Sequence, residues 1–415
     1  MVRLGELETG IAGTAAPLSA SEHARLRSAQ NTLLRDLTAP AAGTSANGAR
    51  RAAAAVQRVS LFDTIPFVAL TADAETVRRL LNNPSVVGVQ EDGLAETLLA
   101  QSVPLIGADQ ARNAGFDGSG QVVAVVDTGV AKSHPMLEGK VVSEACYSTT
   151  APGSTSLCPG GAAASTAVNS GVNCNVNIDG CEHGTHVASI AVGNASNLKG
   201  VAPGAKLISI KVFSRFYWAD YCGVGTTPCA LAYWSDITQG LERVYALRSS
   251  FRIAAVNLSV GGGLYASNCS ADFPALTMII NKLRSAGIAT VVAAGNNGAN
   301  GQISAPACIP STVAVGSTTK GDVVSSFSNM SPLVDLMAPG TDIRAAIPGG
   351  GYAYMSGTSM AAPHVSGTWA ILKQAKLNAS VPAVQSALVK TGKPVRRSRY
   401  TKRRINVMPA LNLLK

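Results

Sequence analysis

The sequence predicts an α/β protein with a parallel, doubly wound sheet that carries helices on both faces, preceded by a small α+β domain. From about residue 120, short runs of apolar and β-branched residues alternate with helix-compatible segments, a pattern typical of βαβ units. Before that point the composition differs, and all eight cysteines lie at or after Cys146. We therefore expect the N-terminal part to form a unit of its own.

In the N-terminal part, residues 60–93 have the clearest pattern. Phe67–Leu70 and Val86–Val89 are predicted strands, and Asp73–Leu81 is a predicted helix with Thr71 as its cap. The preceding residues are rich in Ala, Gly, Ser, Thr and Arg and show weak periodicity. We expect this unit to be ordered mainly over 60–93.

In the larger part, the apolar runs predict five strands and the segments between them predict four helices. The expected strands are Val122–Val126, Leu207–Val212, Ala254–Leu258, Ala289–Ala293 and Thr312–Val315, and the expected helices are 184–192, 235–248, 273–286 and 360–374. Crossovers between such parallel strands are almost always right-handed. Ligands bind beyond the carboxyl ends of the strands in these sheets, so the polar residues that follow them, Asp127, Ser259 and Asn296, are candidate site residues.

The formal net charge of +10 raises the question of a nucleic-acid or membrane partner. Much of the excess lies in one stretch, 390–404, where Tyr400 is the one interleaved aromatic residue, and we expect no nucleic-acid partner. No stretch is apolar for long enough to span a bilayer, so no membrane partner is expected. We expect a monomer.

The eight cysteines lie in loop-like surroundings, which favours disulfides and an oxidising compartment. Their pairing cannot be deduced from the sequence, although short separations favour Cys174–Cys181 and Cys222–Cys229. No CxxC pair supports zinc. The expected location is extracellular or periplasmic, although the first residues, with Arg3, Glu6 and Glu8, do not show a secretory signal.

Three segments carry candidate chemistry. Asp127 ends an apolar strand, where a carboxylate needs a partner, and it could alternatively cap the next turn. His183 stands at the entrance of a helix, while His186, one turn further, is expected to be a packed core residue. Ser359 is predicted at a helix N-terminus, where backbone N–H groups favour a developing anion, or where a serine could act as a simple cap.

These segments, Val-Val-Asp-Thr-Gly, His-Gly-Thr-His and Gly-Thr-Ser-Met-Ala-Ala-Pro-His-Val-Ser-Gly, resemble the signatures of the subtilisin family in the order Asp, His, Ser. The resemblance covers about residues 100–395. It implies a serine endopeptidase in which Asp127 orients His183, His183 is the general base and acid, and Ser359 is the nucleophile. Asn296, in Ala-Ala-Gly-Asn-Asn-Gly, would supply the oxyanion-hole amide.

The resemblance also implies where a substrate would bind. Ser259, Val260 and Gly261 would pair with an extended peptide through backbone hydrogen bonds. The stretch Ala293, Ala294 and Gly295 would form the other wall of the S1 pocket. Small residues on both walls suggest a roomy pocket that takes apolar or aromatic side chains.

Residues 1–99 resemble the family's propeptide, which assists folding and then inhibits its own protease as a transient partner. Ala100-Gln-Ser-Val-Pro resembles a mature N-terminus, so self-cleavage is expected near Leu99–Ala100, leaving 100–415 as the peptidase domain.

The family needs no cofactor for catalysis, but its members often bind calcium. One familiar site uses an aspartate where this chain has Met136 and is expected to be absent. A second, similar to that of the proteinase K group, would use Asp335 with the carbonyl groups of Pro310 and Thr312, although Asp335 could equally cap a strand.

Two other classes of function were weighed. An inactive family homologue that binds peptides would have lost a triad member, and all three are present. A small-molecule enzyme of the Rossmann class is disfavoured because the glycines at Gly118 and Gly120 precede the first strand instead of following it.

Overall fold

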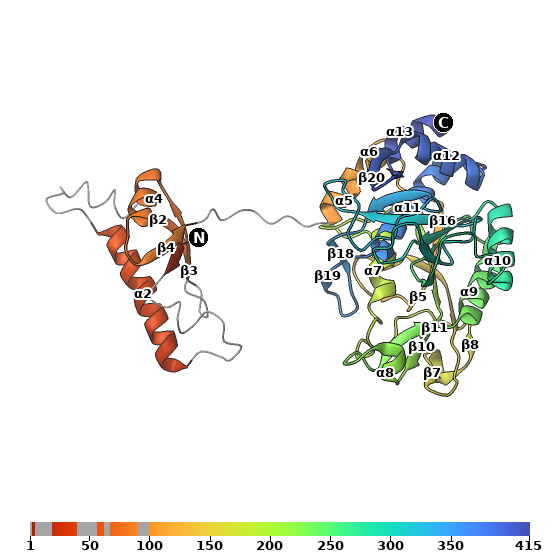
Figure 1. Cartoon of the computed structure of the whole chain (residues 1–415), viewed down its shortest axis with the longest axis horizontal. Coiled ribbons are helices and arrows are strands. Elements are labelled where there is room, and N and C mark those ends of the chain that lie inside the picture. The colour runs from red at the N-terminus through yellow and green to blue at the C-terminus, as the bar shows by residue number, and fades with distance from the viewer. Residues whose placement is uncertain (1, 5–18, 40–55, 62–66, 90–98) are drawn as a thin grey trace. The chain divides into compact units, whose positions relative to one another are not determined.

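The computed structural model describes residues 2–4, 19–39, 56–61, 67–89 and 99–415. The chain divides into two compact units, Met1–Ala95 and Glu96–Lys415, each described by itself here (Figure 1).

Unit 1 is a small α+β unit. Its four-stranded antiparallel sheet has the order β2-β3-β1-β4, with strands β1 (Val2–Leu4), β2 (Val56–Leu61), β3 (Phe67–Ala72) and β4 (Val86–Val89). Two helices accompany it, α2 (Ala20–Thr38) and α4 (Ala74–Leu81). Apolar side chains from both layers, among them Leu33 and Val68, form its own core.

The helix α2 was missed by the sequence analysis, which expected order mainly over 60–93. Ser19 begins it with a capping box, in which the Ser19 hydroxyl accepts from the Glu22 N–H and Glu22 accepts from the Ser19 N–H at 2.7 Å. Its buried side chains follow helical spacing, but one of them is a glutamine, which weakened the apolar pattern. The expected cap Thr71 is wrong: Asp73 caps α4 by accepting from Thr76 N at 2.8 Å.

Unit 2 is built on a large twisted sheet. Among the described residues the sheet has ten strands in the order β20-β21-β17-β16-β14-β12-β5-β9-β6-β8. Its middle is parallel, and antiparallel partners occur at the two edges. The parallel strands are β5 (Val122–Asp127), β6 (Val141–Tyr147), β9 (Lys206–Lys211), β12 (Ile253–Leu258), β14 (Ala289–Ala293), β16 (Val313–Thr318) and β17 (Leu336–Pro339).

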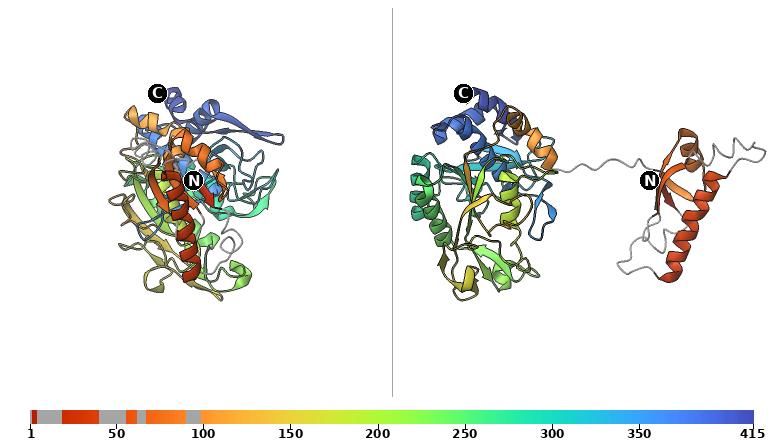
Figure 2. Two further views of the ribbon diagram at one scale, coloured as in Figure 1. Left: turned by 90° about the vertical axis from the view of Figure 1, so that its left-hand side faces the viewer. Right: turned by 180° about the vertical axis from the view of Figure 1, so that it is seen from behind.

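Helices cover both faces of this sheet, as expected for a doubly wound fold (Figures 1 and 2). One face is buried under α7 (His183–Val192) and α11 (Thr358–Ala375), together with α5 (Leu99–Leu105), α6 (Ala108–Asn113), α12 (Val381–Thr391) and α13 (Val407–Leu414). The other face packs against α9 (Trp234–Ala246) and α10 (Pro274–Ser285). All five strands and four helices predicted for this part are present within a few residues of their expected bounds.

Smaller elements complete unit 2. A three-stranded antiparallel sheet has the order β11-β10-β7, made of β7 (Ser154–Ser156), β10 (Phe213–Phe216) and β11 (Cys229–Ala232). The others are β8 (Ala164–Ser165), the helix α8 (Ala219–Cys222), the paired strands β13 (Gly262–Tyr265) and β15 (Ile303–Ala305), and the hairpin β18 (Ile343–Ala346) and β19 (Tyr352–Met355).

The basic C-terminal stretch forms the hairpin β20 (Lys393–Arg397) and β21 (Tyr400–Arg404), which extends the large sheet next to β17. Asp322 pairs with Lys393 at 2.7 Å and with Arg404 at 2.8 Å. Part of the basic stretch is therefore used to hold the sheet edge.

The eight cysteines form four disulfides, Cys146–Cys158, Cys174–Cys181, Cys222–Cys229 and Cys269–Cys308. The second and third are the pairs favoured by their short separation. No helix of the described residues is both long enough and apolar enough to cross a membrane.

Candidate active site

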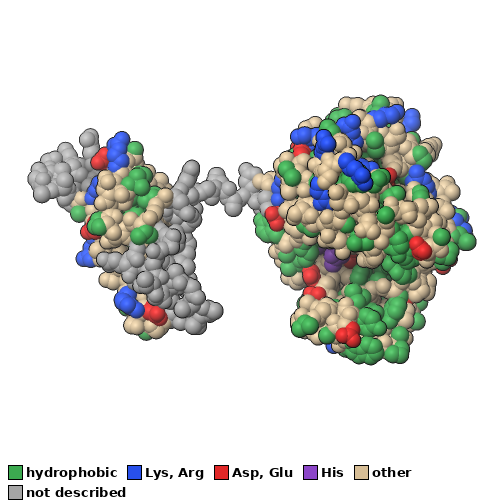
Figure 3. All heavy atoms as spheres, in the orientation of Figure 1, with side chains coloured by type: hydrophobic (Ala, Val, Ile, Leu, Met, Phe, Trp, Pro, Cys, Tyr) green, Lys and Arg blue, Asp and Glu red, His purple; other side chains and the backbone are tan. Residues whose placement is uncertain are grey.

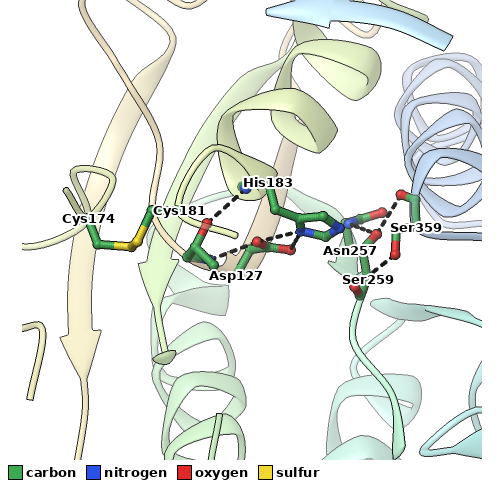
Figure 4. A network of polar contacts seen from close by, with 9 residues as sticks. Asp127, Cys174, Cys181, His183, Asn257, Ser259 and Ser359 are labelled. Carbon is green, nitrogen blue, oxygen red and sulfur yellow. Dashed lines mark hydrogen bonds and ion pairs between the residues drawn. A yellow bond between two sulfur atoms is a disulfide. The ribbon is translucent and has the colours of Figure 1, made fainter. Parts of the chain in front are cut away.

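Asp127 and His183 meet at the carboxyl end of the sheet. Asp127 is the last residue of β5 and is fully buried, and His183 begins α7. The Nδ1 atom of His183 lies 2.9 Å from Oδ1 and 3.0 Å from Oδ2 of Asp127 (Figure 4). A buried carboxylate is thereby given a partner, and the imidazole is fixed with Nε2 as its free nitrogen.

The close approach of α7 to β5 depends on a glycine and a threonine. A Cβ atom at Gly184 would lie 2.3 Å from the Gly129 carbonyl oxygen, so a larger residue cannot occupy this position. Thr128 Oγ1 accepts from the Gly184 N–H at 2.9 Å, and the Thr128 N–H donates to Asp127 Oδ1 at 2.7 Å. The helix start and the carboxylate are therefore held by one short segment.

The electrostatics of His183 follow from this pair. Burial works to lower the pKa of the imidazole, but the charge and hydrogen bond of Asp127, with the charge of Glu182, raise its pKa above the usual 6.5. His186, by contrast, is fully buried, lies one turn further along α7 and donates from Nε2 to the Ala353 carbonyl. Its burial lowers its pKa to about 4, as expected of a neutral core histidine.

Ser359 is the second residue of α11, and both Ser359 and His183 line one cleft of about 940 Å³. Its hydroxyl donates to the Ser259 carbonyl at 3.2 Å, and the Ser259 hydroxyl donates to the Ser359 carbonyl at 2.9 Å (Figure 4). The serine is thus held at the cleft wall beside the segment that follows β12, with its Oγ atom turned to Ser259 instead of His183.

Asn296 lines the same cleft and is oriented by its amide oxygen. Oδ1 accepts from the Thr358 N–H and from the Thr358 hydroxyl, each at 2.9 Å. Since both bonds use the oxygen, the NH₂ group of Asn296 is the end left to act as a donor. The hydroxyl of Thr358 in turn accepts from the Gly295 N–H at 3.1 Å.

The expected substrate-binding residues lie around this cleft with one exception. Ser259, Val260 and Gly261 line one part of it, and Ala293 and Gly295 line another. Ala294 is fully buried, and its carbonyl accepts from the Ser304 N–H and from the Asn329 side chain. Successive residues of an extended chain point to opposite sides, which explains why Ala294 faces away while its neighbours line the cleft.

Several cleft residues were not found from the sequence. Phe213, Leu231, Ala232 and Trp234 contribute a wall from the small sheet and the start of α9. No motif marks them, because they come from a segment whose place beside the cleft depends on the fold. Thr358 could have been found, since its hydroxyl side chain directly precedes Ser359 in the Gly-Thr-Ser-Met motif.

Asp335, the side chain expected to bind calcium, already has protein partners in the structure. Asp335 Oδ2 accepts from the Ala314 N–H at 2.8 Å, and its pKa is raised to about 6 because it is buried. Two positive side chains, Lys402 and Arg284, act on the same carboxylate. Both positive side chains compete with a cation for this carboxylate, and no step of the reaction is assigned to a metal.

His364 links α11, the helix that carries Ser359, to the start of unit 2. It lies fully buried in α11, where its Nδ1 faces the Met360 carbonyl at 2.8 Å and its Nε2 lies 2.8 Å from the Ser102 hydroxyl of α5. Burial lowers its pKa to about 4.

The comparisons with known proteins agree with this geometry. Residues 118–404 match the model of the Subtilase family. The chain is 34% identical over 320 residues to Subtilisin NAT of Bacillus subtilis subsp. natto, covering 75% of this chain and 71% of that protein. It is also 34% identical over 319 residues to an alkaline protease of Alkalihalobacillus alcalophilus, covering 75% of this chain and 70% of that protein.

Among solved structures, a cold adapted subtilisin-like serine proteinase shares 29% sequence identity with this chain at a TM-score of 0.52. The match covers 70% of this chain and 88% of that one. The chain belongs to the subtilase family. It is therefore a serine-type endopeptidase with a subtilisin-like fold.

Proposed function

We propose that this endopeptidase acts through Asp127, His183 and Ser359 as its triad and hydrolyses protein or peptide substrates through an acyl-enzyme. The observation that carries the proposal is the His183 Nδ1 to Asp127 hydrogen bond, formed beside a cleft that Ser359 also lines. His183 Nε2 would take the proton of the Ser359 hydroxyl as the oxygen attacks the scissile carbonyl. Rotation of Ser359 away from the Ser259 carbonyl would bring its Oγ atom to the imidazole.

The oxyanion formed by this attack would be bound by two donors. The NH₂ group of Asn296 is one, and the backbone N–H of Ser359, at the start of α11, is the other. The proton held by His183 would then pass to the leaving amine, and water would release the acyl group by the same route in reverse.

We further propose that 1–99 is a propeptide and 100–415 the peptidase domain, separated by self-cleavage near Leu99–Ala100. Support comes from the division of the chain into Met1–Ala95 and Glu96–Lys415 and from the separate core of unit 1. The four disulfides support an extracellular or periplasmic location. Ala293 and Gly295 support an S1 pocket that accepts apolar or aromatic side chains.

The deciding experiment expresses the full chain in three forms: wild type, Ser359→Ala and Ser356→Ala. Ser356 lies three residues away, where its hydroxyl contacts Asp342, and serves as a matched control. Wild type and Ser356→Ala should shorten themselves near residue 100 and digest casein, with the new N-terminus read by mass spectrometry. Ser359→Ala should stay at full length, and an active Ser359→Ala protein would refute the mechanism.

The inactive, peptide-binding alternative is tested by the same set. It requires wild type and Ser359→Ala to be equally inert on casein and equally able to bind a peptide. Cleavage sites in a denatured protein mixture would then give the P1 preference, which we expect to be broad and biased toward apolar or aromatic residues.

A further inference from the structure

The segment between β10 and β11 carries a group of exposed aromatic and apolar side chains. Tyr217, Trp218 and Tyr221 are 42%, 48% and 53% exposed, and Val224 is 97% exposed. Figure 3 shows hydrophobic side chains gathered at the lower end of unit 2, the end that carries β7, β10 and α8 in Figure 1. Exposed apolar residues scattered singly need no explanation, but a gathered group of them marks a binding surface.

Two side chains of this group, Trp218 and Tyr221, are held in place by contacts between aromatic rings. The Trp218 ring stacks on Tyr221, with centroids 5.8 Å apart, and Tyr221 meets Phe216 edge-on at 5.4 Å. Phe216 also contacts Tyr233 at 5.5 Å. The cluster is thus a fixed platform, whose ordering cost is met before any partner binds.

The backbone around the cluster is adapted to hold it. Gly153 lies under the indole of Trp218, where a Cβ atom would come within 2.8 Å of the ring. A side chain at this position would therefore displace Trp218. The disulfide Cys222–Cys229 closes the loop that carries Val224 and returns the chain to β11. We call Tyr217, Trp218, Tyr221 and Val224 the aromatic platform.

The aromatic platform lies beside the strand β11, which also lines the substrate cleft. Phe216 of β10 pairs with Cys229 of β11, and residues paired across antiparallel strands share a face of the sheet. Leu231 and Tyr233 follow Cys229 by two and four positions, so they lie on that same face. Leu231 is 36% exposed and also lines the cleft, so this face of β11 runs from the cleft toward Phe216, the neighbour of the platform.

The position of β11 relative to the cleft indicates which part of a bound substrate would reach the platform. Ser259–Gly261, expected to pair with an extended peptide beside the S1 pocket, lead directly into β13, whose Leu264 lines the cleft with Leu231. A polypeptide that leaves the cleft past Leu231 and follows β11 would reach the platform.

We propose that the aromatic platform binds an apolar or aromatic stretch of a polypeptide substrate, upstream of the residues that fill the cleft. This inference rests on the proposed function and deepens it, because it names the substrates for which the enzyme is selective: chains with an apolar segment on the N-terminal side of the cleaved bond. Aromatic contacts of this kind stabilise a complex enough to change kcat/KM about tenfold.

The test compares two peptide substrates with the same four residues before the scissile bond. One carries an N-terminal extension rich in Phe, Leu and Val, and the other an extension of the same length made of Gly, Ser and Asn. The self-processed wild-type enzyme should cleave the apolar peptide about tenfold more efficiently, mainly through a lower KM.

Trp218→Ala with Tyr221→Ala should remove this preference and leave a short tetrapeptide substrate cleaved as by wild type. Trp218→Phe should restore most of it, because a ring still lies on Gly153. Met278→Ala is the matched control, since Met278 is 63% exposed on α10 and lies outside the platform. It should keep the full preference.

Several outcomes overturn the proposal. The preference could survive in the double variant, or the double variant could lose activity on the short substrate to the same extent. The platform could instead bind a lipid surface; wild type would then bind phosphatidylcholine–phosphatidylglycerol vesicles, and the double variant would not. It could also bind a second copy of this chain, which light scattering would detect as a change of mass. If wild type cleaves none of the peptides, the proposed function itself fails, which is a different result.

Discussion

Thr358 holds Asn296 through two hydrogen bonds to a single atom, the amide Oδ1. One comes from the Thr358 N–H and the other from its hydroxyl, so the amide cannot rotate without losing both. The NH₂ group is thereby presented to the cleft before any substrate binds, which is the condition for an effective oxyanion donor.

We predict that Asn296→Leu lowers kcat by about 10²- to 10³-fold with little change in KM, because the donor acts only in the transition state. Thr358→Val removes the hydroxyl bond but keeps the N–H bond, so its loss in kcat should be smaller. Steady-state kinetics on one peptide substrate check both. Equal losses in the two variants would show that Asn296 is not the donor.

The Asp127–His183 pair predicts the acid limb of the activity profile. His183 must be neutral to act as a base, and the charge of Asp127 raises its pKa above 6.5. Activity of wild type should therefore rise with pH through a midpoint above 6.5. Asp127→Asn should move the midpoint to lower pH and reduce kcat by about 10⁴-fold, the scale known for a subtilisin triad.

The same pair predicts how stability depends on pH. A histidine whose pKa is raised by folding stabilises the fold fully below its unfolded pKa, near 6.5, and loses this effect as pH rises through the folded pKa. The melting temperature gap between Ser359→Ala and the Asp127→Asn, Ser359→Ala double variant should then be larger at pH 6 than at pH 9. The serine variant prevents self-digestion, and a gap that is constant or grows with pH would contradict the pairing.

The Cys174–Cys181 disulfide predicts a local effect on activity. Cys181 lies two residues before His183, and the Cys174 N–H donates to the Thr128 carbonyl at 3.3 Å, so this link connects the two segments that hold the triad pair. Replacing both cysteines by serine should cost about 2–3 kcal/mol of stability by loop entropy and also lower kcat.

Cys269–Cys308 provides the comparison. It closes a longer loop, with a sequence separation of 39 against 7, so its removal should cost more stability, about 4 kcal/mol, but affect kcat less. Thermal unfolding and kinetics at a temperature where all forms are folded give both quantities. If kcat falls more on loss of Cys269–Cys308, the link before His183 has no particular role in positioning it.

Asp335 leads to a prediction about calcium. Because its carboxylate is bound by Ala314 and lies in the field of Arg284 and Lys402, we expect it not to hold the ion. The change in melting temperature between millimolar calcium and a chelator should be the same in wild type and Asp335→Asn. A calcium response that the variant loses would place the ion at Asp335.

Five strands and four helices of unit 2 could be predicted because their apolar runs are long and are separated by clear breaks. The triad candidates could be found because they lie in continuous motifs. The helix α2 was not predicted because Gln30 interrupts its apolar stripe, although Ser19 and Glu22 form a capping box that the sequence shows. The wall of Phe213, Leu231 and Trp234 could not be found, since only the packing of the small sheet brings it to the cleft.

The contact of Ser102 with His364 limits where the proposed precursor could be cut. His364 lies in the interior of the helix that carries Ser359, and a nitrogen left without its hydroxyl partner there would be costly to desolvate. Cleavage upstream of Gln101 would keep this anchor, so that the new chain end would stay tied to α11. Cleavage beyond Ser102 would release the anchor, and trimming by even three residues past Leu99 should therefore loosen the peptidase domain that the proposed processing would leave.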